Sequence, residues 1–344
     1  MVNLIFYRKE GVTMNRNYFG HESQLYRVEE HRLVGGKGDN MRLFQVNNGS
    51  GIEFTVSADR AADISRLSFQ GINMSYFSPC GYVAPAYYNE KQLKFLHSFT
   101  CGFLTTCGLA SIGAPSEYDG EAYGLHGTIS HIPAERVSWD ISDEGEIKVQ
   151  ARIMDACIFN QKIRLDRTYT CAYGSNEMHI DDTYTNMGSA PSPFLLLYHI
   201  NLGYPLLSET SMVDISSSEV KPRNEEAKAG MDKWREMSAP IPNFAEQCFY
   251  HSFDSKEAVA KIYNPTIEKG LSIHFDPSVL PLMCEWKMMG EKDYVLGLEP
   301  GNNYLEGRAQ LEKENRMTYI NPGQTIHNRI TVRFHDNQDS WKEA

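Results

Sequence analysis

Residues 147–153 read IKVQARI, and this stretch decides the fold class because apolar and polar side chains alternate along it. Successive side chains of a β-strand point to opposite faces, so strict alternation predicts a strand with one buried face. The same period recurs at 52–56, 163–165, 178–182 and 330–334. Half-buried strands of this kind are typical of antiparallel sheets.

Short turn-forming clusters separate these strands. They read NNGSG at 47–51, DEG at 143–145, YGSN at 173–176 and NPG at 321–323. Many short strands with turns between them predict an all-β, mainly β fold, a large antiparallel β-sandwich with few short helices. The two helix candidates are Glu225–Met237 and Tyr88–Phe99, the second with Leu93, Leu96 and Phe99 spaced for one face.

The chain is expected to form one domain over residues 15–344, because no linker, low-complexity tract or internal repeat interrupts it. Residues 1–14 form an N-terminal extension that we expect to be loosely held. Its apolar run precedes Arg8 and Lys9, whereas a signal peptide places its positive residues first. Met14 is an alternative start of the chain.

Composition restricts the partners. The chain has 344 residues, of which 41% are hydrophobic and 22% charged, with a formal net charge of -11. An acidic surface repels phosphate backbones and anionic lipid, so we expect no nucleic acid and no membrane as partners. A homodimer is left open.

The cysteines point to a reduced, cytoplasmic protein. There are 7 of them, without CxxC pairs or histidines at zinc-site spacing. We expect buried thiols, no metal and no organic cofactor. Gly35–Gly38 lacks the spacing of a phosphate-binding loop, and no serine lies in a nucleophile elbow.

Charged residues follow the first clear strand, at Arg60 and Asp63. One interpretation is a surface salt-bridge cluster. The other is that Arg60 reaches into a pocket and Asp63 orients it, since a planar guanidinium suits vicinal hydroxyls or a carboxylate.

Two histidines are candidates for chemistry. His126 lies between Leu125 and Gly127 at the end of a glycine-containing loop, where a ligand can approach the backbone closely. His199 and Asn201 share one face of an apolar strand, where they form either an internal hydrogen-bond network or a proton donor beside a hydroxyl-binding amide.

A late segment supplies the candidate base. Glu299 ends an apolar strand before Pro300, and a carboxylate there is expected to have a raised pKa, which suits a general base. Trp286 is either a core residue or a platform for a sugar face. Lys287 and Asn302 are further candidates for ligand contact.

Taken in order, these segments resemble the aldose 1-epimerase (galactose mutarotase-like) superfamily, and within it the divergent DUF4432 family. The resemblance covers about Val34 to Phe334 and rests on motifs that read LTTCGL at 104–109, GLHG at 124–127, YHINLGYP at 198–205 and GLEPGN at 297–302. It implies a large antiparallel sandwich with a sugar site in a cleft on one sheet, and a small-molecule sugar as partner.

The resemblance also implies roles. His126 matches the histidine that binds the sugar ring, His199 the general acid and Glu299 the general base. Thr106 and Cys107 stand near the place of the usual Asn-Arg pair, and we hypothesise that Arg60 supplies the missing guanidinium.

The expected function is therefore interconversion of sugar anomers by ring opening, with protonated His199 as the acid. Two alternatives stay open: a non-catalytic sugar-binding or sensing module, and another isomerase or lyase reaction on a sugar. Lys287, Arg60 and Arg308 leave room for an acidic or phosphorylated sugar.

Overall fold

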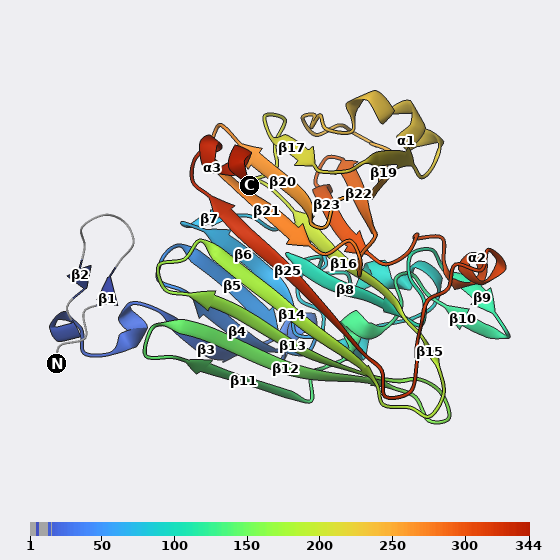
Figure 1. Ribbon diagram of the computed structural model, residues 1–344, viewed down its shortest axis with the longest axis horizontal. Coiled ribbons are helices and arrows are strands. Elements are labelled where there is room, and N and C mark those ends of the chain that lie inside the picture. The colour runs from blue at the N-terminus through green and yellow to red at the C-terminus, as the bar shows by residue number, and fades with distance from the viewer. Residues whose placement is uncertain (1–4, 7–12, 15) are drawn as a thin grey trace.

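Three antiparallel sheets build most of the chain in the computed structural model, which describes residues 5–6, 13–14 and 16–344 (Figure 1). The prediction of a loosely held extension at residues 1–14 concerns a segment of which 1–4 and 7–12 lie outside the described residues. The short strands β1 (Ile5–Phe6) and β2 (Thr13–Met14) pair there.

The strands of each sheet follow in spatial order. The eight-stranded sheet contains β11 (Arg136–Ile141), β12 (Glu146–Ala156), β13 (Lys162–Ala172), β14 (Glu177–Asn186), β25 (Thr325–His335), β21 (Lys269–Phe275), β20 (Ala258–Asn264) and β17 (Met212–Ile215). The six-stranded sheet contains β18 (Glu219–Pro222), β19 (Gln247–Ser252), β22 (Leu282–Met289), β23 (Tyr294–Gly301), β16 (Leu195–Leu202) and β8 (Leu104–Leu109). The five-stranded sheet contains β3 (Arg27–Arg32), β4 (Arg42–Asn47), β5 (Ile52–Ser57), β6 (Asp63–Phe69) and β7 (Ile72–Asn73).

Small elements complete the chain. Two more strand pairs are β9 (Ser116–Tyr118) with β10 (Glu121–Tyr123), and β15 (Ser192–Pro193) with β24 (Tyr319–Ile320). The α-helices are α1 (Glu225–Ala229), α2 (Arg308–Lys313) and α3 (Gln338–Glu343). The 3-10 turns are η1 (Arg16–Tyr18), η2 (Glu22–Gln24), η3 (Gly36–Gly38), η4 (Pro85–Tyr87), η5 (Gln92–His97), η6 (Ile129–His131) and η7 (Met231–Lys233). No helix in the described part of the chain combines the length and apolar content needed to cross a membrane.

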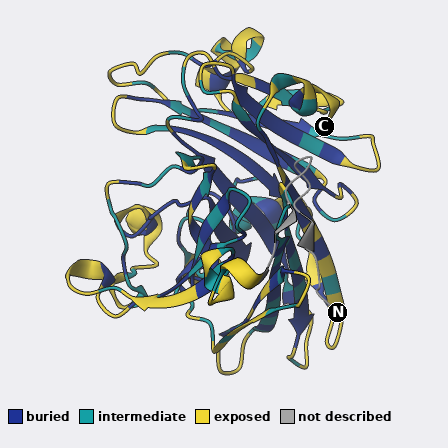
Figure 2. Cartoon of the chain, turned by 90° about the vertical axis from the view of Figure 1, so that its left-hand side faces the viewer, coloured by how far each residue is buried: buried dark blue, intermediate teal, exposed yellow. Residues whose placement is uncertain are grey.

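One hydrophobic core joins the three sheets. Phe54 of β5 packs against Tyr169 of β13, with ring centroids 5.8 Å apart, so the five-stranded sheet lies on the eight-stranded sheet. Tyr198 of β16 reaches Tyr184 of β14, with their hydroxyl oxygens 3.4 Å apart, so the six-stranded sheet packs on the same layer. Buried residues fill the central strands, and exposed residues collect in turns, in short helices and on edge strands (Figure 2).

The alternation read from the sequence is confirmed. Ile147, Val149, Ala151 and Ile153 of β12 are all buried, and their neighbours are more exposed. The fold is therefore the mainly antiparallel sandwich that the pattern predicts.

The two helix predictions are only partly right. The first candidate shortens to α1, because the backbone turns at Gly230 and continues as η7. The second is wrong as an amphipathic helix: it contains only the 3-10 turn η5, in which Leu93 and Leu96 are exposed and Phe95 is buried. Spacing for an α-helix face does not apply to a turn with three residues per repeat.

Candidate active site

A cavity of about 330 Å³ lies over one face of the six-stranded sheet. Its floor carries His199 from β16, Cys284 from β22 and Glu299 from β23. Residues of the segments 93–99 and 113–126 form part of its wall. The volume falls in the range of small-molecule sites.

Strand β16 serves two sides of the sheet because its side chains alternate. Tyr198 faces the core between the sheets, where its hydroxyl donates to Oδ2 of Asp182 at 2.7 Å. His199, one residue later, lines the cavity. Sequence alternation alone thus separates the structural residue from the candidate catalytic one.

Glu299 lies directly beside His199. Strands β16 and β23 are antiparallel and pair Ile200 with Leu298, so positions 199 and 299 face each other in the ladder. Nδ1 of His199 is 3.2 Å from Oε1 of Glu299, and the two side chains are 5% and 2% exposed. The sequence prediction that these two residues act together agrees with this geometry.

Three buried polar atoms at this cavity have no hydrogen-bond partner among the described residues: Nδ1 of His199, Oε1 of Glu299 and Nδ1 of His126. The first two are close, yet their contact lacks hydrogen-bond geometry. Such atoms are uncommon in folded proteins because leaving them unpaired costs stability. Their convergence favours a ligand whose polar atoms complete them.

His126 is held toward the cavity by an unusual backbone. Its φ angle is 60°, a left-handed conformation that is rare outside glycine and collects at functional sites. Its N–H donates to the carbonyl of Gly113 at 3.0 Å, and its carbonyl accepts from Gly108 at 2.9 Å. Its ring centroid lies 5.3 Å from that of His199.

Burial sets the protonation states of this group. It lowers the pKa of His199 well below the usual range, and the neighbouring His126 adds to this effect. It lowers the pKa of His126 to about 3 and raises the pKa of Glu299 well above its usual range. Burial therefore favours a proton on Glu299 over a proton on His199. These directions run against the expectation of a protonated His199, since desolvation disfavours the imidazolium.

Aromatic rings enclose the polar floor. The Trp286 ring centroid is 5.4 Å from that of His199, and the Phe99 centroid is 5.1 Å from it. Nε1 of Trp286 donates to Oε2 of Glu246 at 2.8 Å, which fixes the indole at the cavity. Apolar rings beside a few polar groups suit a sugar, which has C–H faces and hydroxyl edges.

Arg223 is a charged lining residue that sequence reasoning missed. It follows β18 directly and lines the cavity. One terminal nitrogen, Nη2, donates to the carbonyl of Leu305 at 2.9 Å. Its only sequence signal is a position inside an ordinary charged segment, which does not distinguish it from a solvated arginine.

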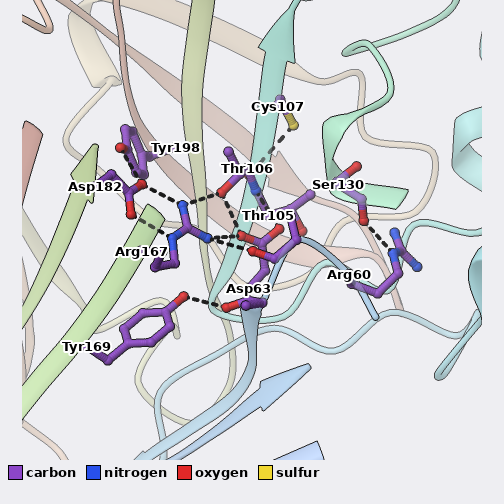
Figure 3. Close-up of polar contacts among 12 residues, drawn as sticks. Arg60, Asp63, Thr105, Thr106, Cys107, Ser130, Arg167, Tyr169, Asp182 and Tyr198 are labelled. Carbon is purple, nitrogen blue, oxygen red and sulfur yellow. Dashed lines mark hydrogen bonds and ion pairs between the residues drawn. The ribbon is translucent and has the colours of Figure 1, made fainter. Parts of the chain in front are cut away.

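Arg60 does not line this cavity, which corrects the hypothesis that it supplies a guanidinium there. Nε donates to the carbonyl of Ser130 at 2.7 Å (Figure 3). Nη1 donates to the carbonyls of Val83 and Ser98, both at 3.0 Å. Nη2 lies 2.9 Å from Nε2 of His131. The guanidinium instead holds loops together in the interior.

Asp63 belongs to a buried charge network and not to the cavity. One terminal nitrogen of Arg167 contacts Oδ1 of Asp63 and the other contacts Oδ2 of Asp182, both at 2.6 Å (Figure 3). The hydroxyl and the backbone N–H of Thr106 donate to the Asp63 carboxylate. Arg60 and Asp63 line a separate void of about 20 Å³, which holds about one water and no sugar.

Three other predicted contacts also lie outside the cavity lining. Asn201 donates to the carbonyls of Gly102 and His199. Nζ of Lys287 donates to the carbonyl of Lys233 at 2.7 Å on the opposite face of the sheet. Asn302 accepts from the N–H of Leu196 and donates to the carbonyl of Phe194, which ties β23 to β16.

Of the residues predicted from sequence, the structure brings together His126, His199, Trp286 and Glu299. Among the described residues no group of three or more His, Cys, Asp and Glu side chains is arranged to hold a metal ion. The arrangement can bind a neutral ring and move protons at its floor.

The amino-acid sequence matches a known protein family. A family model described as "Domain of unknown function (DUF4432)" matches residues 38–334. No curated protein matches the chain.

Solved structures share the fold. A Klebsiella pneumoniae protein, provisionally described as an aldose 1-epimerase, is 26% identical over 94% of this chain and 88% of its own, with a TM-score of 0.89. A galactose mutarotase-like protein from Clostridium acetobutylicum is 14% identical over 92% and 100%, with a TM-score of 0.62. Galactose 1-epimerase from Lactobacillus acidophilus is 14% identical over 91% and 100%, with a TM-score of 0.57.

Proposed function

Because the chain belongs to the DUF4432 family and has the fold of aldose 1-epimerase-like proteins, we propose that it is a sugar-binding aldose 1-epimerase-like enzyme. The reaction is the interconversion of sugar anomers by acid–base ring opening. The observation that carries the proposal is the buried, unpartnered His199–Glu299 pair at the floor of a sugar-sized cavity.

The proton inventory of the pair suits this reaction. In this proposal Glu299 begins protonated and His199 begins neutral, which are the forms that burial favours. His199 accepts the proton of the anomeric hydroxyl while Glu299 donates to the ring oxygen, and the hemiacetal opens to an aldehyde. Rotation about the adjacent carbon–carbon bond presents the other carbonyl face. Both protons then return as the ring closes.

The residues exchange roles within one turnover, so the implied assignment of Glu299 as base and His199 as acid describes the second half of the same cycle. Each proton transfer contributes about 10²–10⁴-fold. His126 and Trp286 position the ring in this proposal, because both line the cavity within contact of His199 or its neighbours.

The test is anomer exchange measured by saturation-transfer NMR over a panel of aldoses, ketoses and uronic acids. Glu299→Gln keeps the shape of the side chain but can neither donate a proton to the ring oxygen nor take it back, so exchange should fall at least about 100-fold while sugar binding persists. Glu285→Gln is the matched control, since Glu285 is a buried carboxyl on β22 outside the cavity lining.

Equal exchange in wild type and Glu299→Gln would contradict the assignment. Sugar binding without acceleration of any anomer would support the alternative of a sugar-binding module. Conversion of the sugar to a different compound would support another isomerase or lyase reaction at the same floor.

A further inference from the structure

We propose that the cavity selects a sugar carrying an anionic group, a carboxylate or a phosphate, and that Arg223 binds that group. The inference rests on the proposed function, because it names the substrate class of the same site. The sequence suggested that Lys287, Arg60 or Arg308 would bind an acidic sugar, but none of these lines the cavity. Arg223 does line it.

The position of Arg223 is fixed by the fold. Its N–H donates to the carbonyl of Cys248 at 2.9 Å, which extends the pairing of β18 with β19 by one residue. The next residue, Asn224, caps α1 by accepting from the N–H of Ala227 at 2.9 Å. The arginine thus stands between a paired strand and a capped helix, so its backbone is held from both sides.

The guanidinium group of Arg223 is held in one orientation, but most of its N–H donors have no hydrogen-bond acceptor among the described residues. It donates to the carbonyl of Leu305 at 2.9 Å and contacts Sγ of Cys248 at 3.9 Å. Guanidinium carries five N–H donors, so most of them remain for a ligand. Within the described residues no carboxylate forms an ion pair with it. A half-buried arginine without a counter-ion at a cavity wall is a binding group for an anion.

The three cationic side chains predicted from the sequence to contact the sugar already have partners within the protein. The guanidinium of Arg60 contacts three backbone carbonyls and His131. Lys287 donates to a carbonyl outside the cavity lining. Arg308 pairs with Glu312 at 3.4 Å and donates to the hydroxyl of Tyr123 at 2.9 Å. Arg223 is therefore the cation that the described part of the chain offers to this cavity.

The remaining lining groups do not cancel its charge. Burial disfavours the charged forms of His126, His199 and Glu299, because it lowers the pKa of both histidines and raises that of the glutamate. Glu246 is exposed, and one of its oxygens already accepts from Trp286, so solvent screens it. Burial is the main cause of the lowered pKa of His126, and the positive charge of Arg223 is the second cause, so the two residues interact electrostatically. An anionic group at Arg223 would therefore lie near the catalytic floor.

The experiment compares matched sugars: glucose with glucuronate and with glucose 6-phosphate, and galactose with galacturonate. In wild type we expect kcat/KM for at least one anionic sugar to exceed that of its neutral partner by about 30-fold or more. The uronates and the phosphate distinguish the two anionic groups.

Arg223→Gln should lower kcat/KM for the anionic sugar far more than for its neutral partner, so that the preference disappears, and Arg223→Lys should retain part of it. Arg316→Gln is the control, because Arg316 is ion-paired with Glu306 and Glu314 outside the cavity lining. Equal kcat/KM for anionic and neutral partners in wild type would overturn the inference, as would an equal loss for both in Arg223→Gln.

Calorimetric binding separates the two proposals. If no sugar exchanges faster but an anionic sugar binds to wild type and not to Arg223→Gln, the inference holds and the proposed reaction fails. If only neutral sugars exchange faster, the proposed reaction holds and the inference fails.

Discussion

A methyl group added to Gly297 would lie 2.2 Å from Oε1 of Glu299 and 3.0 Å from Cβ of Trp286. Gly297 is two residues before Glu299 on β23, so both point to the cavity face. Because Gly297 has no side chain, the carboxyl group of Glu299 can occupy the space beside it.

Gly297→Ala should therefore displace the Glu299 carboxyl and lower kcat at least about 10-fold, with a loss of about 1–3 kcal/mol in the free energy of unfolding. Gly290→Ala in the same hairpin is the control, because the atom nearest to its methyl would be the flexible end of Met288, at 2.9 Å, and the Asp293 carbonyl oxygen at 3.4 Å is an ordinary contact. Anomer exchange and urea unfolding measure both effects. Unchanged kcat in Gly297→Ala would contradict the role of this space.

The pKa directions of the catalytic pair predict a plateau of activity around neutral pH. Activity should fall in acid as His199, whose pKa is lowered, becomes protonated and can no longer accept a proton. It should fall in base as Glu299, whose pKa is raised, ionises and can no longer donate. A pH profile of kcat/KM checks this. A single decline near pH 6.5 on raising the pH would instead support a protonated His199 as the starting acid.

Buried histidines predict acid sensitivity of the fold. Burial lowers the pKa of His131 to about 2 and that of His126 to about 3. The unfolded chain binds protons as pH falls through about 6.5, and the folded chain does not, so stability present above that pH is lost below it. Between pH 6.5 and 5 each of these two histidines should lower the free energy of unfolding by about 2 kcal/mol.

Urea unfolding at several pH values measures this slope. His131→Gln should flatten the pH dependence even though it lowers stability overall, because His131 also contacts Arg60 and Ser98. An unchanged slope would show that His131 is not a source of the effect.

The buried charge network predicts a large loss on removing its centre. Arg167 is 0% exposed at its side chain and is shared by Asp63 and Asp182. Arg167→Leu would leave two buried carboxylates unpaired, so we expect a loss of about 3–5 kcal/mol. Arg329→Leu, which breaks an exposed pair with Asp181, should cost less than about 1 kcal/mol. Comparable losses in the two variants would contradict the network's role.

Cys248 should be the reactive thiol of the cavity. The neighbouring Cys284 thiol, and after it Arg223, lower its pKa, whereas the pKa of Cys284 is raised well above its usual range. In a Cys157→Ser background, which removes an exposed thiol, iodoacetamide should modify Cys248 before Cys284 and slow anomer exchange. Mass spectrometry identifies the modified residue, and Cys248→Ser should resist the inhibition. Preferential modification of Cys284 would contradict the prediction.

The strands could be predicted because they depend on a local pattern, and His199 and Glu299 could be singled out because each lies in a short motif. Alternation marks β12, and the histidine and glutamate stand in short distinctive motifs. The register that makes positions 199 and 299 neighbours is a long-range property and could not be read from either strand alone.

The errors among the cations have one physical cause. Arg60 looks like a pocket residue in sequence, yet its acceptors come from positions 23 to 71 residues away and satisfy it inside the fold. Arg223 looks like a surface residue, yet the pairing of β18 with β19 brings it to the cavity. Whether a charged side chain is satisfied depends on distant backbone that composition does not reveal.

Strand β16 places Tyr198 in the charge network of the interior and His199 in the cavity, one residue apart. The position of His199 therefore depends on how Tyr198 packs in the interior, so core packing and the geometry of the floor are linked through this strand. Leu93, Leu96 and Arg223 belong to the cavity wall and lie outside this strand. Under the proposed function, substitutions in the wall can change which sugar binds while the floor keeps its geometry.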